Sequence, residues 1–452
     1  MKLETPRNLA LSVLNGLSHR PILLESYLDD VSRSNAQLDE RDRAFISHLV
    51  QGVLRWRLRL DWIIEQSSHF PFEKITPPIL NILRLALYQI FFLDRVPDSA
   101  AVNEAVNQSK AHGPKHVVSF VNAILRGVCR KRDEITFPDR DSEPAHYLSV
   151  FYSYPLWLVQ RWIEDWGVDF TEGLLSAGNR IPDLIIRTNI LRLGRHELIG
   201  RLREEGVRAS PTSYSPQGII VEGLRGKPDV LSSFKEGLFQ VQDQAAQITS
   251  HLLAPKPGEN ILDICAGLGG KSTHLAELMD DRGRVLALDI SHRRLISLGK
   301  NSRRLGIECI TSLVADASTC IASLFRSKFD KVMIDAPCSG FGVISRHPDG
   351  KWNRSEADIH RLALLQKSIL SEAVSILRSG GKMLYVTCTV SKEENEEVVQ
   401  DCLKRHGDVS LLNMKAHVPE WCLDLVDDLG FLRTFPHVHH MDGFFAALFV
   451  KR

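Results

Sequence analysis

The sequence contains the stretch Ile261-Leu262-Asp263-Ile264-Cys265-Ala266-Gly267-Leu268-Gly269-Gly270-Lys271-Ser272-Thr273. Its apolar beginning is typical of a strand, its middle of a glycine-rich turn and its end of a helix start. Glycines in such a turn let backbone N–H groups approach a ligand closely, and a helix N-terminus favours a negative group. The pattern differs from G-x-G-x-x-G and from the P-loop, so it does not indicate a dinucleotide or a nucleoside triphosphate.

Alternating strands and helices surround this stretch and decide the fold class. Apolar runs of strand length lie at residues 261–266, 285–289, 311–314, 331–335 and 382–388, and helical patterns lie at 271–279, 292–305 and 355–377. Continuous apolar strands separated by helices predict a mostly parallel sheet that helices cover on both faces. Residues 237–452 are therefore expected to form a Rossmann-like α/β domain.

Three aspartates follow successive predicted strands, namely Asp289, Asp316 and Asp335. Ligands of open parallel sheets bind at the carboxyl ends of the strands, so three acids there are expected to line one site. Asp289 is placed to accept both hydroxyls of a ribose, and Asp316 lies where an adenine amino group could be held. A nucleoside without phosphates suits this edge, and the expected cofactor is S-adenosyl-L-methionine.

The earlier part of the chain divides into two further predicted domains. Residues 1–135 carry apolar residues at helical spacing almost throughout, which predicts an all-α domain of about five to seven helices. A charged stretch with two prolines at 131–144 is the predicted linker. Residues 145–236 mix helical patterns with two short strand-like runs, at 184–189 and 218–221, which predicts a small α+β subdomain.

Composition excludes several classes of protein. The 452 residues carry 56 Lys and Arg against 55 Asp and Glu, a formal net charge of +1, so no strongly basic nucleic-acid binder is visible in the total. No apolar run approaches the roughly 20 residues that cross a bilayer. The eight cysteines stand singly and form no metal-ligand pattern. These features predict a cytoplasmic protein with no membrane contact, no disulfide framework and no metal site.

Two cysteines have a placement that suggests chemistry. Cys338 follows the predicted strand 331–335 in a loop rich in Pro, Gly and Ser, and Cys388 ends the predicted strand 382–388. The six other cysteines are interpreted as small core residues, the usual role of a free cysteine. A thiolate that adds to C6 of cytosine makes C5 nucleophilic toward a sulfonium methyl group, and loss of the C5 proton then expels the thiolate. Spacing does not say which thiol attacks, and Asp335 is a candidate to contact N3 of the base.

These residues resemble the motifs of a known family. Asp335-Ala336-Pro337-Cys338-Ser339-Gly340 with Arg346-His347-Pro348-Asp349 and Lys351-Trp352 is similar to the fourth motif of RNA cytosine-5 methyltransferases of the Sun/Fmu (NOL/NOP/sun) family. Thr387-Cys388-Thr389 resembles its sixth motif, residues 265–271 its first, residues 239–247 the segment before that, and Gly443-Phe444-Phe445-Ala446-Ala447 its C-terminal strand motif. The helical front part resembles the NusB-like RNA-binding domain through Arg43-Ala44-Phe45, Asn103-Glu104-Ala105-Val106 and residues 120–126.

The resemblance implies roles that the residues alone leave open. It implies that Cys388 is the nucleophile, that Cys338 assists release of the adduct, and that the substrate is a cytosine at one fixed position of 16S ribosomal RNA. It also carries cofactor contacts to Cys265, Ala266, Gly267, Leu268, Gly269, Gly270, Lys271, Asp289, Asp316 and Asp335. Two departures are Ala-Gly-Leu-Gly-Gly-Lys in place of the commoner Ala-Ala-Pro-Gly-Gly-Lys, and Thr389 in place of serine. Both retain the backbone freedom or the hydroxyl group that the motif needs.

Recognition of RNA requires an unpaired or flipped cytosine, because C6 cannot be attacked within a base stack. Candidates to hold phosphates and neighbouring bases are Arg187, Asn189, Arg346, His347, Lys351 and Trp352. Arg55, Arg57 and Arg59 around Trp56 form a further candidate stripe, although alternating arginines on a helix are also typical of a solvated face. The expected partner is free 16S rRNA or an early small-subunit precursor, bound by a monomer.

Two other classes of function remain open at this point. The same chemistry serves cytosine-5 methyltransferases that act on DNA or on tRNA. A catalytically idle RNA-binding or antitermination factor would use only the NusB-like part, but such a module has no need of the Cys338 and Cys388 pair or of the aspartate series.

Overall fold

The structure is a computed structural model, and it describes residues 5–19, 24–35, 37–224, 226–325 and 327–452. The chain forms two compact units. The first contains Met1–Arg180 and Ile344–Asn353, and the second contains Ile181–Val343 and Arg354–Arg452. Among the described residues, no helix combines the length and the apolar character that a membrane span requires.

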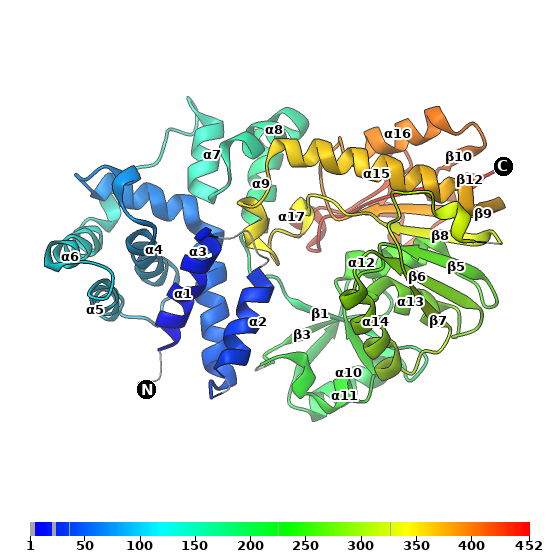
Figure 1. Ribbon diagram of the computed structural model, residues 1–452, viewed down its shortest axis with the longest axis horizontal. Helices are drawn as coiled ribbons and strands as arrows, with labels where there is room; N and C mark the ends of the chain where they lie inside the picture. Colours follow the sequence, from blue (N-terminus) through cyan, green and yellow to red (C-terminus); the bar gives the residue numbers. More distant parts are fainter. Residues whose placement is uncertain (1–4, 20–23, 36, 225, 326) are drawn as a thin grey trace. The chain divides into compact units, whose positions relative to one another are not determined.

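The first unit is helical, and its centre is an apolar helix. Its helices are α1 (Pro6–His19), α2 (Leu24–Ser34), α3 (Glu40–Ser67), α4 (Pro77–Phe92), α5 (Asp98–Ser109), α6 (Lys115–Arg130), α7 (Pro144–Tyr152), α8 (Leu156–Trp166) and α9 (Val168–Gly178). Helix α4 contacts α1, α3, α5 and α6 (Figure 1), and apolar side chains bury most of its surface. A helix that is apolar on nearly all sides becomes the core of a bundle. The prediction of an all-α front domain is confirmed.

The division of the chain differs from the predicted one in two places. Helices α7 to α9, expected in the α+β subdomain, pack with the helical unit, because α7 contacts α3 and Trp62 Nε1 of α3 donates to Thr136 O at 2.9 Å. Residues 344–353, expected within the α/β domain, also belong to the helical unit. Their contacts there, described below, use side chains whose partners are far away in the sequence.

The second unit begins with a four-stranded antiparallel sheet in the order β2-β3-β1-β4. Its strands are β1 (Leu184–Thr188), β2 (Arg208–Pro211), β3 (Gly218–Glu222) and β4 (Phe239–Val241). Helix α10 (Arg195–Glu204) buries Leu198, Ile199 and Leu202 in the same apolar cluster as Ile186 and Ile219 of the sheet. The two strands that the sequence predicts here are present.

The remainder of this unit is an eight-stranded sheet in the order β10-β12-β9-β8-β5-β6-β7, with β11 paired to β12. Its strands are β5 (Asn260–Ile264), β6 (Arg284–Asp289), β7 (Ile310–Val314), β8 (Phe329–Asp335), β9 (Leu377–Thr387), β10 (Val409–Leu412), β11 (Leu432–Arg433) and β12 (Phe445–Lys451). Strands β5 to β9 pair in parallel, whereas β10, β11 and β12 pair antiparallel. The predicted mostly parallel sheet is confirmed.

Helices cover both faces of this sheet, as Figure 1 shows for the second unit. They are α12 (Gln244–Leu253), α13 (Gly270–Leu278), α14 (His292–Leu305), α15 (Glu356–Ile376) and α16 (Glu396–Arg405). Successive side chains of a strand point to opposite faces. Ile261 therefore joins the cluster of α12 and α13, whereas Leu262 joins that of α15 and α16.

Candidate active site at the carboxyl edge of the sheet

The strand order brings the predicted site residues to one edge. In the order β9-β8-β5-β6-β7, Cys388 directly follows β9, Asp335 ends β8, the glycine-rich turn follows β5, Asp289 ends β6 and Asp316 follows β7. All five strands are parallel, so these ends lie side by side at the carboxyl edge.

The glycine-rich turn after β5 needs unusual backbone angles. Gly267 and Gly269 have φ values of 57° and 83°, and Cys265 has 63°, a left-handed value that few non-glycine residues adopt. A Cβ at Gly269 would collide with the side chain of Leu298. Burial and the surrounding aspartates raise the pKa of the Cys265 thiol, so this cysteine is a structural part of the turn and not a nucleophile.

The carboxylate of Asp289 is tied to this turn. It accepts the N–H of Gly267 at 2.9 Å and the N–H of Ser291 at 2.7 Å, and only 3% of the residue is exposed. These two bonds fix the carboxylate at the end of β6, where the sequence places the ribose contact. Asp316 is exposed, and hydrogen bonds from Ser318 lower its pKa, so it remains ionised.

The residues around the turn fit a nucleoside that carries an amino-acid portion. Leu268 and Ile290 are apolar yet 61% and 70% exposed; Leu268 follows Gly267, which donates to the Asp289 carboxylate, and Ile290 follows Asp289 itself. Exposed apolar side chains at a ligand edge suit the face of a base. Asp263 is fully buried, its Oδ1 has no hydrogen-bond partner, and burial is the main cause that raises its pKa to about 7. A buried carboxyl oxygen that lacks a hydrogen-bond partner in the protein can bind a polar group of a ligand.

An ion pair joins the turn to the end of β8. Lys271 Nζ lies 2.6 Å from Asp335 Oδ2, and the Phe444 ring centroid lies 5.3 Å from the same nitrogen. Burial disfavours the ammonium charge of Lys271, but Asp335 outweighs it and holds the pKa of Lys271 above its ordinary value. The pair fixes the Asp335 carboxylate between the turn and the Cys338 loop.

The two predicted thiols lie next to each other. Their Sγ atoms are 3.3 Å apart, and all eight cysteines are free. The hydrogen bond shared with Cys388, together with burial, raises the pKa of Cys338 well above that of an ordinary thiol. Cys338 therefore keeps its proton and can donate it as a hydrogen bond to the sulfur of Cys388. Cys402 and Cys422 are buried as predicted, but the core interpretation of Cys320 is wrong because this residue is exposed.

A buried carboxylate that the sequence did not single out holds the Cys338 loop. Glu394 Oε1 accepts the N–H of Ser339 at 2.8 Å and the amide of Gln366 at 3.0 Å, and its Oε2 accepts the Ser339 hydroxyl. The Ser339 hydroxyl also lies 2.7 Å from that of Thr389, the residue after Cys388. In the sequence, Glu394 belongs to no recognised motif. It stands in a polar run beside Glu393, a pattern that is typical of a solvent-exposed segment.

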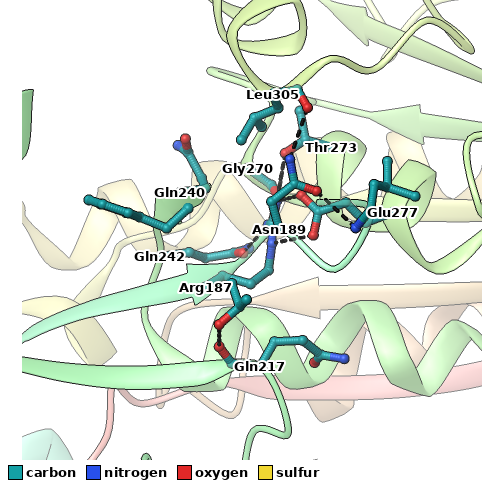
Figure 2. Close-up of polar contacts among 12 residues, drawn as sticks. Arg187, Asn189, Gln217, Gln240, Gln242, Gly270, Thr273, Glu277 and Leu305 are labelled. Carbon is teal, nitrogen blue, oxygen red and sulfur yellow. Dashed lines mark hydrogen bonds and ion pairs between the residues drawn. The ribbon is translucent and has the colours of Figure 1, made fainter. Parts of the chain in front are cut away.

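Two of the predicted RNA contacts are wrong, because their side chains are buried in a polar cluster (Figure 2). The guanidinium of Arg187 is 0% exposed and lies 2.7 Å from Glu277 Oε1. It also donates to Thr273 Oγ1 at 3.0 Å, to Gly270 O at 2.7 Å and to Gln242 Oε1. Asn189 donates to the carbonyls of Gly237 and Leu305. Arg187 holds α13 and Asn189 holds the end of α14, so these buried side chains cannot reach RNA.

The prediction for Lys351 is wrong for the same reason, since this side chain is 0% exposed within the helical unit. Trp352 is also engaged there, because its Nε1 donates to Leu54 O at 2.7 Å. The arginine stripe of α3 is not a solvated patch: Arg55 is 4% exposed, and Arg59 lies over the Phe151 ring at 4.4 Å. Arg346 and His347 are half-buried and exposed, respectively, and remain predicted RNA contacts.

Comparison with known proteins assigns each part of the chain. The family model "NusB family" matches residues 4–130, the model "Methyltr_RsmF/B-like, ferredoxin-like domain" matches 154–225, and the model "16S rRNA methyltransferase RsmB/F" matches 250–450. A protein of Bacillus subtilis named "Probable ribosomal RNA small subunit methyltransferase B" is 33% identical over 453 residues and covers 100% of both chains. The chain belongs to the RsmB/F family.

Further relatives agree with this assignment. A Synechocystis protein of the same name is 36% identical over 98% of both chains, and "Ribosomal RNA small subunit methyltransferase B" of Escherichia coli is 33% identical over 92% of both. As a member of the RsmB/F family, the chain is an S-adenosylmethionine-dependent rRNA methyltransferase with a NusB-like front domain. The predicted family, fold class and cofactor are confirmed.

Solved structures show the same architecture. The crystal structure of the protein PH0851 aligns with a TM-score of 0.80 and 27% identity, and covers 99% of each chain. A methyltransferase homologue from Pyrococcus horikoshii aligns with a TM-score of 0.59 and 27% identity, over 69% of this chain and 100% of its own. Among the described residues, no group of three or more His, Cys, Asp and Glu side chains is arranged to hold a metal ion.

Proposed function

We propose that this chain methylates C5 of a cytosine in 16S rRNA, the family target being cytosine 967, through a covalent adduct between Cys388 and C6 of the base. The observation that carries the proposal is the Sγ–Sγ distance of 3.3 Å between Cys388 and Cys338 at two neighbouring parallel strand ends. A methyltransferase that modifies a nitrogen or a sugar oxygen has no use for such a pair.

The roles proposed for the two thiols are those that the family resemblance implies, and the environment of Cys338 supports them. Cys338 keeps its proton, because its pKa is raised by the bond to Cys388 and by burial. A thiol that donates to a neighbouring sulfur stabilises that neighbour as a thiolate, which is the nucleophilic form. Cys388 is therefore assigned as the nucleophile, and Cys338 as the group that assists its departure.

With Cys388 as the nucleophile, the reaction consists of addition to the base, methyl transfer and elimination. The Cys388 thiolate forms a bond to C6, and the electron pair of the C5–C6 double bond makes C5 nucleophilic. Bound S-adenosylmethionine would supply an electrophilic methyl group to C5, and its S–CH3 bond would break to leave S-adenosylhomocysteine. Loss of the C5 proton to a base then restores the double bond and breaks the bond from C6 to Cys388 Sγ. Cys338 stabilises the leaving thiolate by hydrogen bonding, and Asp335, held by Lys271, contacts N3 of the base.

The cofactor contacts are assigned to the turn and to the aspartates described above. The residues are Cys265, Ala266, Gly267, Leu268, Gly269, Gly270, Lys271, Asp289, Asp316 and Asp335. Asp289 is assigned to the ribose hydroxyls, because its carboxylate is already oriented by two backbone N–H groups. The partner is proposed to be free 16S rRNA or an early precursor, bound by a cytoplasmic monomer.

The test compares two single variants on the same RNA. Purified chain is incubated with labelled S-adenosylmethionine and either protein-free 16S rRNA or assembled small subunits, and the modified base is mapped. Cys388→Ala is expected to abolish methyl transfer and adduct formation, whereas Cys338→Ala is expected to accumulate a protein–RNA adduct that survives denaturing electrophoresis. A tRNA pool and a DNA duplex serve as competing substrates.

Three results would contradict the proposal. The adduct would accumulate in Cys388→Ala and disappear in Cys338→Ala if the thiol roles were exchanged. Methyl label on an exocyclic nitrogen or a ribose oxygen would exclude the C5 chemistry. Label in tRNA or DNA but not in rRNA would exclude the substrate.

A further inference from the structure

Cys338 and Cys388 stand on neighbouring backbone segments of the second unit that are joined on both sides of the Cys338 loop. Before the loop, β8 and β9 pair in parallel, and Ala336 N donates to Val386 O at 2.9 Å. After the loop, Gly342 N donates to Cys388 O at 2.9 Å. Neighbouring strands lie about 4.7–4.9 Å apart, and the two Cα atoms of a disulfide are usually about 4.4–6.8 Å apart. The backbone spacing at this edge therefore suits a bond between the two side chains.

The two sulfur atoms are already close to bonding distance. Their separation of 3.3 Å exceeds an S–S bond of about 2.05 Å by only about 1.3 Å, a gap that rotations of two side chains can share. The backbone around Cys338 is held in place, because Gln366 Nε2 donates to Pro337 O at 2.9 Å. On the other side of this cysteine, Ser339 N donates to Glu394 Oε1 at 2.8 Å. A thiol fixed beside its partner has a far higher effective concentration there than a thiol in solution.

Both thiols can be reached by a small reagent, since both are half-buried, whereas Cys402 and Cys422 are buried. The hydrogen bond shared with Cys388, together with burial, raises the pKa of Cys338, so Cys338 keeps the proton and favours a thiolate at Cys388. Oxidants react with the thiolate form of cysteine. Cys388 is therefore the sulfur of the pair that an oxidant attacks first, and Cys338 is the thiol beside it.

A hydroperoxide can supply the two oxidising equivalents that a disulfide requires. With hydrogen peroxide, the Cys388 thiolate bonds to one oxygen, the O–O bond breaks, and the departing hydroxide takes up a proton to become water. The Cys338 thiol then attacks the sulfenic acid at Cys388. An S–S bond forms, the S–O bond breaks, and the hydroxyl group leaves with the thiol proton as a second water. Two thiols are thus oxidised to one disulfide, while one peroxide is reduced to two waters.

We propose that Cys338 and Cys388 are an oxidation site, at which a hydroperoxide converts the thiol pair into a reversible intramolecular disulfide. The bond halts the oxidation of Cys388 at a reversible stage, because a sulfenic acid with no thiol beside it proceeds to sulfinic acid. A dithiol restores both thiols by exchange. Formation of the disulfide requires no methyl transfer. The loss of activity that accompanies it rests on the proposed function, because a bonded Cys388 sulfur cannot attack cytosine.

The first experiment maps the bond by peptide mass spectrometry. Purified chain is treated with hydrogen peroxide, remaining thiols are blocked, and tryptic peptides are compared with and without dithiothreitol. Cys338 lies in peptide 332–346 and Cys388 in peptide 383–392, so the disulfide is expected as one cross-linked pair that dithiothreitol separates. Cys320→Ser is the matched control, since it removes an exposed thiol outside the pair and is expected to form the same bond.

The second experiment tests the protection of Cys388. Folded Cys338→Ala, checked by circular dichroism, is treated with the same peroxide and then with dithiothreitol. Peptide 383–392 of this variant is expected to retain sulfinic acid, whereas the wild-type chain recovers unmodified Cys388. In the wild type and in Cys320→Ser, methyl transfer is expected to fall in proportion to the cross-linked fraction and to return after dithiothreitol. If Cys338→Ala does not fold, Cys338→Ser replaces it with the same readouts.

Two results would overturn the inference. One is the absence of the cross-linked pair at a peroxide dose that oxidises Cys320. The other is equal recovery of unmodified Cys388 in the wild type and in Cys338→Ala, which would show that Cys338 gives no protection. Failure of the proposed function has a different outcome: the cross-linked pair would form, but methyl transfer would persist in the cross-linked protein and in Cys388→Ala.

Discussion

Replacement of Arg187 by methionine is expected to destabilise the second unit strongly. The guanidinium donates five hydrogen bonds, two of them to Glu277, and neither side chain is exposed. Removing one partner of a buried ion pair costs about 3–5 kcal/mol, because the other charge stays buried without compensation. A domain is stable by only about 5–15 kcal/mol, so this loss is a large share of the total.

The assay is hydrogen exchange of peptides from β1 and α13, which reports the free energy of opening of this unit alone. A loss of about 3–5 kcal/mol raises the open population between roughly a hundredfold and a few thousandfold. The double variant Arg187→Met/Glu277→Met is expected to recover most of the loss, because it leaves no unpaired charge in the core. The single variant Glu277→Met is the matched control, since it leaves the arginine unpaired instead.

The loss of unfolding free energy in Arg187→Met should also depend on pH. Burial already raises the pKa of Glu277 even with Arg187 present, and removing the arginine raises it further. The folded variant then binds a proton that the unfolded chain, with a pKa of about 4.3, releases, so its stability falls as pH rises between those two values. Arg187→Met should therefore lose stability relative to the wild type as the pH rises above about 4.3. A loss below about 1 kcal/mol, or a double variant no more stable than the single one, would refute this reasoning.

Three further predictions concern the site. Asp289→Ala is expected to weaken binding of S-adenosylmethionine by roughly 10- to 100-fold in calorimetric titration, because hydrogen bonds to a charged group contribute about 1.5–3 kcal/mol, while RNA affinity stays unchanged; equal loss of both would contradict the ribose role. Gly342→Ala is expected to lower the free energy of unfolding by about 1–3 kcal/mol and to slow methyl transfer, because its Cβ would overlap the carbonyl of Gly443; a fully active, equally stable variant would show that this backbone contact is dispensable. Asp263 has a pKa of about 7 in the folded chain, raised by burial, against about 3.9 unfolded, so cofactor-free protein should lose thermal stability from pH 4 to pH 7; Asp263→Asn should flatten this dependence, and an unchanged slope would assign it to another group.

The sheet and the thiol pair could be predicted because their signals are local. Each parallel strand is a short apolar run, and each site residue stands at a strand end within a few positions of that run. The strand order then places these residues in one site, because neighbouring parallel strands have their carboxyl ends at the same edge of the sheet. The prediction that Cys338 and Cys388 share one site needed no knowledge of distant packing.

The wrong predictions concern charged side chains whose partners are distant in the sequence. Arg187 lies near the end of a strand and resembles an exposed ligand contact until Glu277, 90 residues later, is placed beside it. Lys351 and Trp352 have the basic and aromatic character of an RNA contact, but Arg55 O lies 296 positions away from Lys351. A local pattern gives the charge of a side chain and not its burial. For Arg187 and Lys351, burial decides the role.

The inclusion of residues 344–353 in the helical unit has a consequence for biosynthesis. A ribosome makes α1 to α9 first, and supplies Lys351 only after the glycine-rich turn and Cys338 have emerged. Until then, water must satisfy the Ser153 carbonyl and the Asn179 side-chain oxygen, both of which accept from Lys351 Nζ in the folded unit. The front helices of the nascent chain are thus expected to finish packing late, when the methyltransferase part is already largely synthesised, so that a truncated product ending at Arg180 would lack one of its own internal supports.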